Sequence, residues 1–193
     1  MRMIRIMEHM SLDGVIQHST DDDDFSYSDW TAPYRTPAGR EAVTAAHGER
    51  FDLLLGRRTY DIWSGFWPKG PSSRIGDRLN AATKYVATHR PESLAWGPFE
   101  GVGPDLVEGV RRIKSQDGSG LVLSGSSTLT STLLEHGLAD EAVLIVSPVL
   151  LGSGKRFFAE GTPAQEFELV STQATPSGVL LNTYKVLGPL KAG

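Results

Sequence analysis

The sequence predicts an α/β fold in which helices cover both faces of a central sheet. Short apolar runs alternate with helical patterns along most of the chain, which is typical of strand–helix–strand units. Three consecutive leucines, Leu53 to Leu55, suit a strand that is buried on both faces. The last two apolar runs, 167–172 and 179–186, flank Thr175-Pro176-Ser177-Gly178, and this pattern predicts a terminal antiparallel hairpin.

The remaining elements follow from hydrophobic periodicity and from residues that start or stop helices. The expected strands are 2–10, 52–55, 84–88, 121–123, 142–146, 167–172 and 179–186. The expected helices are 37–50, 59–66, 105–114 and a segment between Ser127 and Gly137 in which Leu129, Leu133 and Leu134 share a face. Pro37 and Gly48 stand near the two ends of the first helix, where these residue types are common. Residues 90–104 are rich in Pro and Gly and are expected to form a loop with room for a short strand.

Length and composition restrict the class of protein. A chain of 193 residues that is 39% hydrophobic can bury one substantial core, so we expect a single domain over residues 1–193. The net charge of −4 and the lack of a long basic block argue against nucleic-acid or anionic-membrane partners. There is no cysteine, which excludes disulfides and thiolate chemistry. Residues 1–7 alternate in polarity and do not form a signal-peptide core, so a cytoplasmic protein is expected.

A candidate phosphate site follows the triple-leucine strand. Gly56 ends the strand, and Arg57, Arg58 and Thr59 come directly after it. A glycine lets a ligand approach the backbone, and the free N–H groups at the start of a helix attract anions. The arginines add positive charge and the threonine adds a hydroxyl donor. The alternative is a plain strand–turn–helix connection with solvated arginines.

A second glycine turn resembles the first in its placement. Ser124, Gly125, Ser126 and Ser127 follow the apolar run 121–123 and can begin a helix. Two helix N-termini at one edge of a sheet can hold a bridging pyrophosphate between them. The pair of turns therefore favours a dinucleotide ligand, although neither turn has the G-x-G-x-x-G pattern of a Rossmann domain.

Further motifs occur in a fixed order, and together they carry a resemblance to a known family. They are Ser11-Leu12-Asp13-Gly14, Asp29-Trp30 with Pro33-Tyr34, 54–60, Lys84-Tyr85-Val86, 133–141 and 148–158. With these motifs the chain resembles the dihydrofolate-reductase-like family, specifically stand-alone proteins similar to the C-terminal reductase domain of the riboflavin-biosynthesis deaminase-reductase. The match spans nearly the whole chain. The resemblance implies a three-layer α/β/α fold with a mixed, mostly parallel sheet, NADPH as hydride donor, and a homodimer.

The resemblance also assigns cofactor contacts to particular positions. It places the phosphates of NADPH against two sets of residues, Gly56, Arg57, Arg58 and Thr59 on one side and Ser124, Gly125, Ser126 and Ser127 on the other. It places the adenosine 2′-phosphate near Thr88, His89 and Arg90, where a cation and a hydroxyl favour NADPH over NADH. One departure is that dihydrofolate reductases carry two adjacent glycines where this chain has Ser124-Gly125.

Hydride transfer requires orientation, a dry site and sometimes one acid from the protein. Asp13 is the candidate catalytic acid, because it leaves the first strand where members of the family bring substrate and nicotinamide together. The alternative is that Asp13 only braces the turn to Gly14. Val15 and Ile16 are expected to pack against the nicotinamide.

The substrate pocket is expected to involve aromatic residues. Trp30, Tyr34 and Tyr60 are candidates for contact with a planar substrate, with burial in the core as the alternative. Folate-type reductases place an acid on the first long helix, where the nearest carboxylate in this chain is Glu41, so folate reduction is not supported. No metal site is expected. The run Asp21 to Asp24 lacks the glycine of a calcium loop, and the five histidines show no ligand spacing.

The leading hypothesis is an NADPH-dependent reductase that acts on a small heterocyclic or carbonyl substrate. Two alternatives stay open, namely a non-catalytic nucleotide-binding module and a flavin-binding protein on the same fold. The sequence does not identify the substrate, because a fold hosts many activities.

Overall fold

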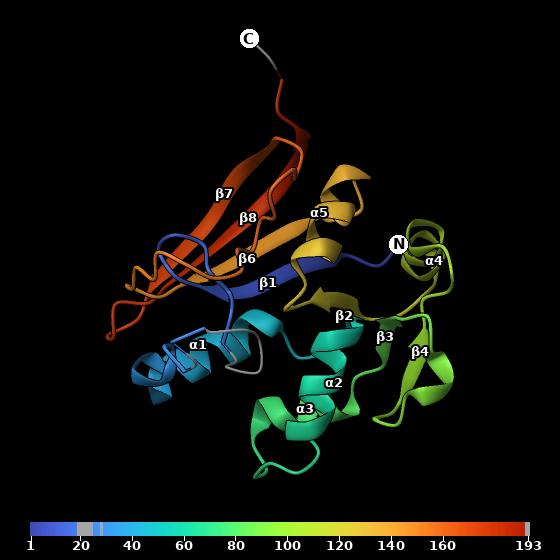
Figure 1. Cartoon of the computed structure of the whole chain (residues 1–193), viewed down its shortest axis with the longest axis horizontal. Coiled ribbons are helices and arrows are strands. Elements are labelled where there is room, and N and C mark those ends of the chain that lie inside the picture. The colour runs from blue at the N-terminus through green and yellow to red at the C-terminus, as the bar shows by residue number, and fades with distance from the viewer. Residues whose placement is uncertain (19–24, 28, 192–193) are drawn as a thin grey trace.

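A computed structural model describes residues 1–18, 25–27 and 29–191 of the chain (Figure 1). Its sheet has eight strands in the order β4-β3-β2-β5-β1-β6-β8-β7. The strands are β1 (Ile4–Met10), β2 (Phe51–Gly56), β3 (Lys84–Ala87), β4 (Phe99–Gly101), β5 (Gly120–Leu123), β6 (Glu141–Val146), β7 (Gln165–Ala174) and β8 (Leu180–Pro189). Strands β1 to β6 are parallel, and the β7–β8 hairpin joins antiparallel to β6. The predicted mixed, mostly parallel sheet with a terminal hairpin is confirmed.

Helices cover both faces of this sheet, as predicted. They are α1 (Pro37–His47), α2 (Arg57–Phe66), α3 (Arg74–Ala81), α4 (Leu106–Ser115) and α5 (Ser127–Glu135), with short 3-10 turns at Ala32–Tyr34 and Pro91–Ser93. One buried cluster contains Val110 and Ile113 of α4 and Leu133 of α5. The other contains Ala42 of α1 and Leu79 of α3. The chain therefore has two hydrophobic layers on opposite sides of one sheet, which makes it a three-layer α/β/α fold.

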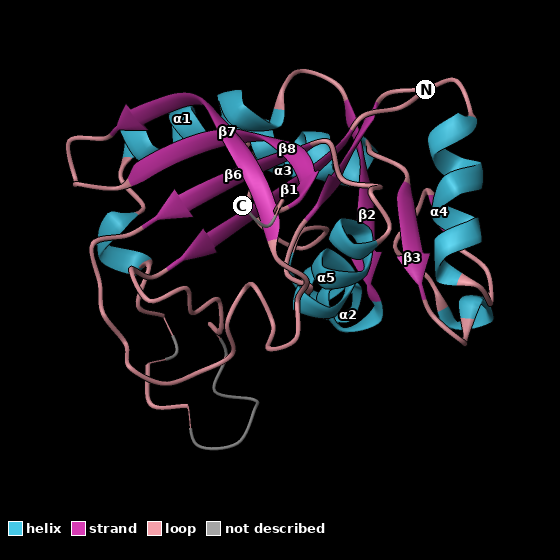
Figure 2. Ribbon diagram, turned by 90° about the horizontal axis from the view of Figure 1, so that it is seen from above, coloured by secondary structure: helices cyan, strands magenta, loops and turns pink. Residues whose placement is uncertain are grey.

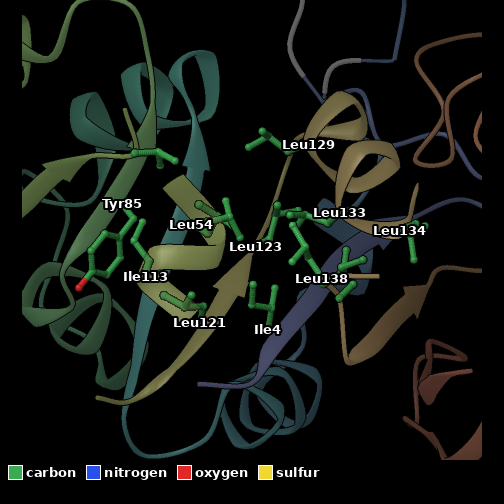
Figure 3. Close-up of a cluster of buried hydrophobic side chains, with 14 of the residues drawn as sticks. Ile4, Leu54, Tyr85, Ile113, Leu121, Leu123, Leu129, Leu133, Leu134 and Leu138 are labelled. Carbon is green, nitrogen blue, oxygen red and sulfur yellow. The ribbon is translucent and has the colours of Figure 1, made fainter. Parts of the chain in front are cut away.

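The triple-leucine strand belongs to both layers. Leu54 packs in the cluster with α4 and α5, where Leu121, Leu123 and Leu133 also lie (Figure 3). Leu53 and Leu55 pack in the cluster on the opposite face. All three leucines are 0% exposed. Because successive side chains of a strand point to opposite faces, this burial confirms that β2 is covered on both sides.

Some elements differ from the prediction. Helix α3 was not predicted, because the polar segment after the Pro, Gly and Ser-rich residues 67–73 has too few apolar residues to identify a helix. Strand β4 is the short strand for which the predicted loop 90–104 leaves room. Helix α3 depends on Ser73, whose side chain accepts a hydrogen bond from the Gly76 N–H and caps the helix. Helix α1 ends at His47, three residues before the predicted end, because Gly48 has φ +83° and leaves the helix there. Strand β7 is longer than expected at both ends, whereas β8 begins one residue later and ends three residues later than expected.

Across the described part of the chain, no helix is long and apolar enough to cross a membrane.

Two helical glycines provide a test of the packing. Gly109 of α4 lies so close to Val102 that an added Cβ would overlap its carbonyl oxygen, whereas no described atom lies within 4 Å of a Cβ added at Gly65 of α2. Gly109→Ala should therefore lower the free energy of unfolding by about 1–3 kcal/mol through overpacking. Gly65→Ala should raise it by about 0.5–1 kcal/mol, because alanine favours the helix. Urea denaturation of both variants measures the difference, and equal effects would contradict the close contact of α4.

Candidate functional site

The candidate site lies where neighbouring strands β2 and β5 send the chain in opposite directions. From β2 the chain continues through α2 and α3 to β3, and from β5 it continues through α5 to β6 on the other side of β1. Helices α2 and α5 pack on opposite faces of the sheet, and the view from above shows α5 over α2 (Figure 2). In open α/β sheets, ligands bind in the crevice at such a switch point, outside the carboxyl ends of the strands.

The two predicted glycine turns meet at this point. A Cβ added at Gly56 would lie 3.1 Å from the Ser126 hydroxyl oxygen. Gly125 has φ +76°, and a Cβ added there would lie 2.7 Å from the Thr59 hydroxyl oxygen. Each glycine therefore lets the other turn approach its backbone. A side chain at Gly125 would clash with Thr59, and one at Gly56 would crowd the Ser126 hydroxyl.

The start of α2 is suited to an anion. The described residues provide no side-chain cap for this helix, and its first turn contains no acidic side chain. Its leading N–H groups therefore keep the partial positive charge of an uncapped helix N-terminus. Helix α5 differs, because the Ser126 side chain accepts a hydrogen bond from the Leu129 N–H. The α2 end is thus the stronger candidate for phosphate contact.

Arg57 connects this helix end to the loop after β3. Its guanidinium donates to Asp61 at 2.9 Å and to the Ser93 hydroxyl at 2.6 Å. Longer contacts run to the Thr88 hydroxyl at 3.4 Å and the Arg90 carbonyl oxygen at 3.3 Å. Ser93 was not predicted from the sequence, because it stands in the Pro-rich segment with no pattern of its own. The structure thus brings together Arg57 and Thr88, two of the residues predicted to contact the cofactor, and adds Ser93 to them.

The other residues predicted to contact phosphate fall into two groups, exposed and buried. Arg58, His89 and Arg90 are exposed at the same edge. Thr59 is buried against Gly125. The Ser124 hydroxyl donates to the Met7 carbonyl oxygen at 2.9 Å, and Ser127 is also buried. These three hydroxyls therefore face protein, so direct contact of their side chains with a phosphate is not supported by the geometry.

Asp13 is held by several donors. Its carboxylate accepts hydrogen bonds from the Ser11 hydroxyl at 2.7 Å and from the N–H groups of Leu151 at 3.2 Å and Gly152 at 2.9 Å. The Ser11 hydrogen bond, with the two backbone donors, lowers the pKa of Asp13 to about 2. A carboxyl group with this pKa is ionised at neutral pH and makes a poor acid. The structure favours the bracing role, and a catalytic role for Asp13 stays a prediction.

The segment after Asp13 is fixed by the glycine-rich loop 148–158. Val15 forms an antiparallel bridge with Arg156, and the Ile16 N–H donates to the Lys155 carbonyl oxygen at 2.8 Å. Val15 is 0% exposed and Ile16 is 7% exposed. Their side chains are therefore part of the core, so a contact with nicotinamide through the Val15 or Ile16 side chain requires movement of this segment.

The predicted substrate aromatics lie in different places. Trp30 packs on Val15 and Phe25, and its ring stacks on His18 with centroids 5.0 Å apart. Tyr34 is half-buried at the edge of the cluster on the α1 side.

Tyr60 requires a correction. It is 2% exposed, and its hydroxyl accepts hydrogen bonds from the N–H groups of Ala95 at 2.8 Å and Trp96 at 2.6 Å. The side chain fastens α2 to the loop before β4, so Tyr60 is a core residue and its predicted contact with substrate is not supported.

Glu8 and His9 of β1 also reach this edge of the sheet, and sequence reasoning missed both. Glu8 is 8% exposed, and its carboxylate accepts hydrogen bonds from the N–H groups of Gly125 and His9. Burial raises the pKa of Glu8 to about 7. Burial also lowers the pKa values of His9 and His18 to about 4, with the charge of Arg35 adding to the effect. The sequence signal that could have identified Glu8 is its place as a charged residue inside an otherwise buried strand.

The remaining candidates do not form a site. Glu41 is exposed and pairs with Arg74 at 3.0 Å, which leaves it outside the candidate site. The described residues contain no group of three metal-ligating side chains. The run Asp21 to Asp24 lies outside the described residues. Two cavities of about 220 and 230 Å³ lie elsewhere, one at the amino ends of β1, β2 and β5 and one beside Phe158 and Phe167.

Comparison with known proteins identifies the family and the fold of this chain. The sequence profile of the RibD C-terminal domain matches residues 2–181. The chain belongs to this family. Members of the family are reductase-like, and the resemblance inferred from the motifs is confirmed at the level of family and fold.

Several individual proteins are similar to this chain in sequence or in fold. YyaP of Bacillus subtilis (strain 168), an uncharacterized protein, is 27% identical over 136 residues, which are 68% of this chain and 72% of YyaP. A pyrimidine reductase-like protein from Corynebacterium diphtheriae NCTC has a similar structure with a TM-score of 0.65 and 12% identity, covering 96% of this chain and 92% of that one. Dihydrofolate reductase from Enterococcus faecalis, solved with NADP(H), gives a TM-score of 0.60 at 17% identity and 96% coverage of both chains.

The bracing role of Asp13 predicts a loss of stability on substitution. In Asp13→Asn an amide N–H₂ replaces one acceptor oxygen, so one backbone donor of the 148–158 loop loses its partner, at a cost of about 1–2 kcal/mol. The pKa of Asp13 is about 2, below its ordinary 3.8, so the carboxylate contributes stability above pH 3.8 and loses it as the pH falls through 2. Thermal and acid unfolding, with exposed Asp117→Asn as control, measure this effect. Full stability with loss of hydride transfer alone would contradict the bracing role and favour catalysis.

For Glu8 we predict that the free energy of unfolding depends on pH in the opposite direction. Its folded carboxyl binds a proton more tightly than the unfolded one, because the pKa is about 7 and not 4.5. Relative to Glu8→Gln, the free energy of unfolding of the wild type should therefore fall as the pH rises from about 4.5 to about 7, by roughly 3 kcal/mol in total. Urea denaturation at several pH values measures the difference between the two proteins. Parallel curves would contradict a buried carboxyl at this position.

Proposed function

We propose that this chain is an NADPH-dependent reductase that transfers a hydride to a small heterocyclic or carbonyl compound. The observation that carries the proposal is the contact between Arg57 at the uncapped start of α2 and the loop of Thr88 and Ser93, beside the Gly125 turn. Membership of a reductase-like family supports it. The start of α2 borders the switch point between β2 and β5, and dinucleotides bind at such switch points in other open α/β sheets.

The residues present suit NADPH. The N–H groups at the start of α2, with the backbone of Gly125 and Ser126, would hold the pyrophosphate. Arg57 and the hydroxyls of Thr88 and Ser93 would hold the 2′-phosphate, because a guanidinium and hydroxyl donors match a dianionic group. Bound NADPH supplies the hydride itself.

The chain's own contribution to the reaction is orientation and exclusion of water. His18 stacks on Trp30 and His9 of β1 lies close to His18, so these rings would form an aromatic wall beside a substrate bound at the carboxyl end of β1. Both imidazoles are neutral at pH 7, since their pKa values are about 4. A neutral, flat wall favours an uncharged planar ring over an anionic substrate. This supports a heterocycle as the hydride acceptor.

Cofactor binding tests the proposal directly. A ligand that binds only the folded state stabilises it by RT ln(1 + [L]/Kd), roughly 2.7 kcal/mol at a hundredfold excess over Kd. NADPH should therefore raise the melting temperature of the wild type. Arg57→Ala should weaken NADPH binding roughly 10- to 100-fold, because charge-assisted hydrogen bonds to the 2′-phosphate are lost. NADH lacks that phosphate, so its affinity should change much less.

The matched control is Asp61→Asn. This variant breaks the ion pair with Arg57 but keeps the cation, so it should bind NADPH at least as tightly as the wild type. If no nicotinamide nucleotide shifts the melting temperature, the proposed function is wrong. A shift with FMN alone would favour the flavin-binding alternative. Equal NADPH binding by Arg57→Ala would leave the function standing and remove Arg57 from the site.

A further inference from the structure

Glu8 occupies a position at the candidate site that the proposed function leaves unexplained. It lies on β1 beside β5, where the register pairs Ile6 with Leu123 and so brings Glu8 level with Gly125. Its carboxylate accepts the Gly125 N–H, which belongs to the turn proposed to hold the pyrophosphate. Gly125 itself lies close to the Thr59 side chain. A buried carboxylate therefore occupies one of the backbone donors that a phosphate would need.

The surroundings of Glu8 contain little that could neutralise a charge. Its described partners are the N–H groups of Gly125 and His9. On β6 its register neighbour is Leu144, and the turn after β5 and the first two turns of α5 bring no ionisable side chain among the described residues. His9, next to it on β1, has a pKa of about 4 and is neutral at pH 7. On α2 the first charges are Arg57, which pairs with Asp61, and Arg58.

An anionic ligand bound at this turn would change the pKa of the Glu8 carboxyl group. A negative charge nearby disfavours the ionised form of a carboxyl group, so a bound pyrophosphate raises the pKa of Glu8 above its value of about 7 in the free protein. A protonated carboxyl group also changes its hydrogen bonding, because it gains an O–H donor and keeps an acceptor oxygen. The neutral form can thus donate to a phosphate oxygen where the ionised form would repel it.

We propose that Glu8 is a positioning residue that couples binding of the dinucleotide phosphates to the uptake of one proton at the Gly125 turn. In the free protein the carboxylate holds the Gly125 N–H. In the complex a proton from solvent adds to a carboxylate oxygen of Glu8, the Gly125 N–H turns to the phosphate, and the new O–H donates to a phosphate oxygen. No other covalent bond forms or breaks. This inference rests on the proposed function, because it requires a pyrophosphate at the turn.

The coupling fixes how affinity depends on pH. Binding that takes up a proton weakens as protons become scarce, since linkage is reciprocal. With the pKa of free Glu8 at about 7, the affinity should be nearly constant below that pH. Above it, Kd should rise about tenfold per pH unit until the pKa of the bound form is reached.

Isothermal titration calorimetry with NADP⁺ tests this prediction. The wild type should show a Kd that rises about sixfold between about pH 7.2 and 8.2, because the pKa of free Glu8 is about 7. Runs at about pH 8 in two buffers of different ionisation enthalpy should show uptake of close to one proton. Glu8→Gln carries a neutral side chain of the same shape, so its Kd should not vary over this range and it should take up no proton.

Two controls separate Glu8 from other titrating groups. His89→Gln removes the exposed histidine near the proposed 2′-phosphate site, and it should keep the pH dependence of the wild type. NADH has no 2′-phosphate of its own to titrate and should show the same dependence as NADP⁺. Wild-type binding without proton uptake at about pH 8 would overturn the inference, and this readout stands even where Glu8→Gln fails to fold.

The outcomes distinguish the two proposals. If NADP⁺ and NADH fail to bind at any pH, the proposed function and the inference both fall. If NADP⁺ binds and the Kd of Glu8→Gln varies with pH as in the wild type, the proposed function stands and the role of Glu8 is wrong. Uptake of one proton by the wild type, absent in Glu8→Gln and present in His89→Gln, supports Glu8 as the group that links binding to pH.

Discussion

Burial of the central strands on both faces determines where this chain can place its chemistry. The side chains of Leu53, Leu54 and Leu55 are 0% exposed, and the strands beside β2 are covered in the same way. A buried parallel sheet offers no polar surface along its length. Most charged and hydrogen-bonding groups therefore gather at or beyond the strand ends, where Gly56, Thr88 and Gly125 lie, and the buried side chains of Glu8 and Lys84 are exceptions.

At the strand ends, two glycine turns pack closely against each other. Gly56 and Gly125 let α2 and α5 approach from opposite faces, which brings two helix N-termini to one crevice. The same closeness buries Thr59 and Ser124 against protein. Backbone N–H groups are then the main donors left for an anion, with Arg57 adding a positive charge at the rim. This explains why we propose that backbone N–H groups, and not the hydroxyls of Thr59 and Ser124, bind the cofactor phosphates.

The sequence predicted what depends on local pattern and missed what depends on neighbours in space. The triple leucine, Gly56 and the serine turn identified β2, β5 and the place where they meet, because strand burial and helix caps leave a local pattern. Helix α3 escaped because Ser73 and Leu79 are too few signals in a polar segment. The placement of Tyr60 in the core depends on the N–H groups of Ala95 and Trp96, far along the chain. Nothing near Tyr60 in sequence indicates those partners.

Glu8 on the first strand and Asp13 in the turn after it show most clearly that the sequence does not reveal a side chain's neighbours in space. Asp13 stands in a recognisable motif and suggested an acid, yet donors from Ser11 and the 148–158 loop hold the pKa of Asp13 at about 2. Glu8 stands in no motif, yet burial beside Gly125 brings its pKa to about 7. Where environments push two carboxyl groups apart in this way, the one near neutrality is the group able to exchange a proton under working conditions. Five residues apart in sequence, the two differ in pKa because hydrogen-bond donors dominate at Asp13, whereas burial outweighs the two backbone donors at Glu8.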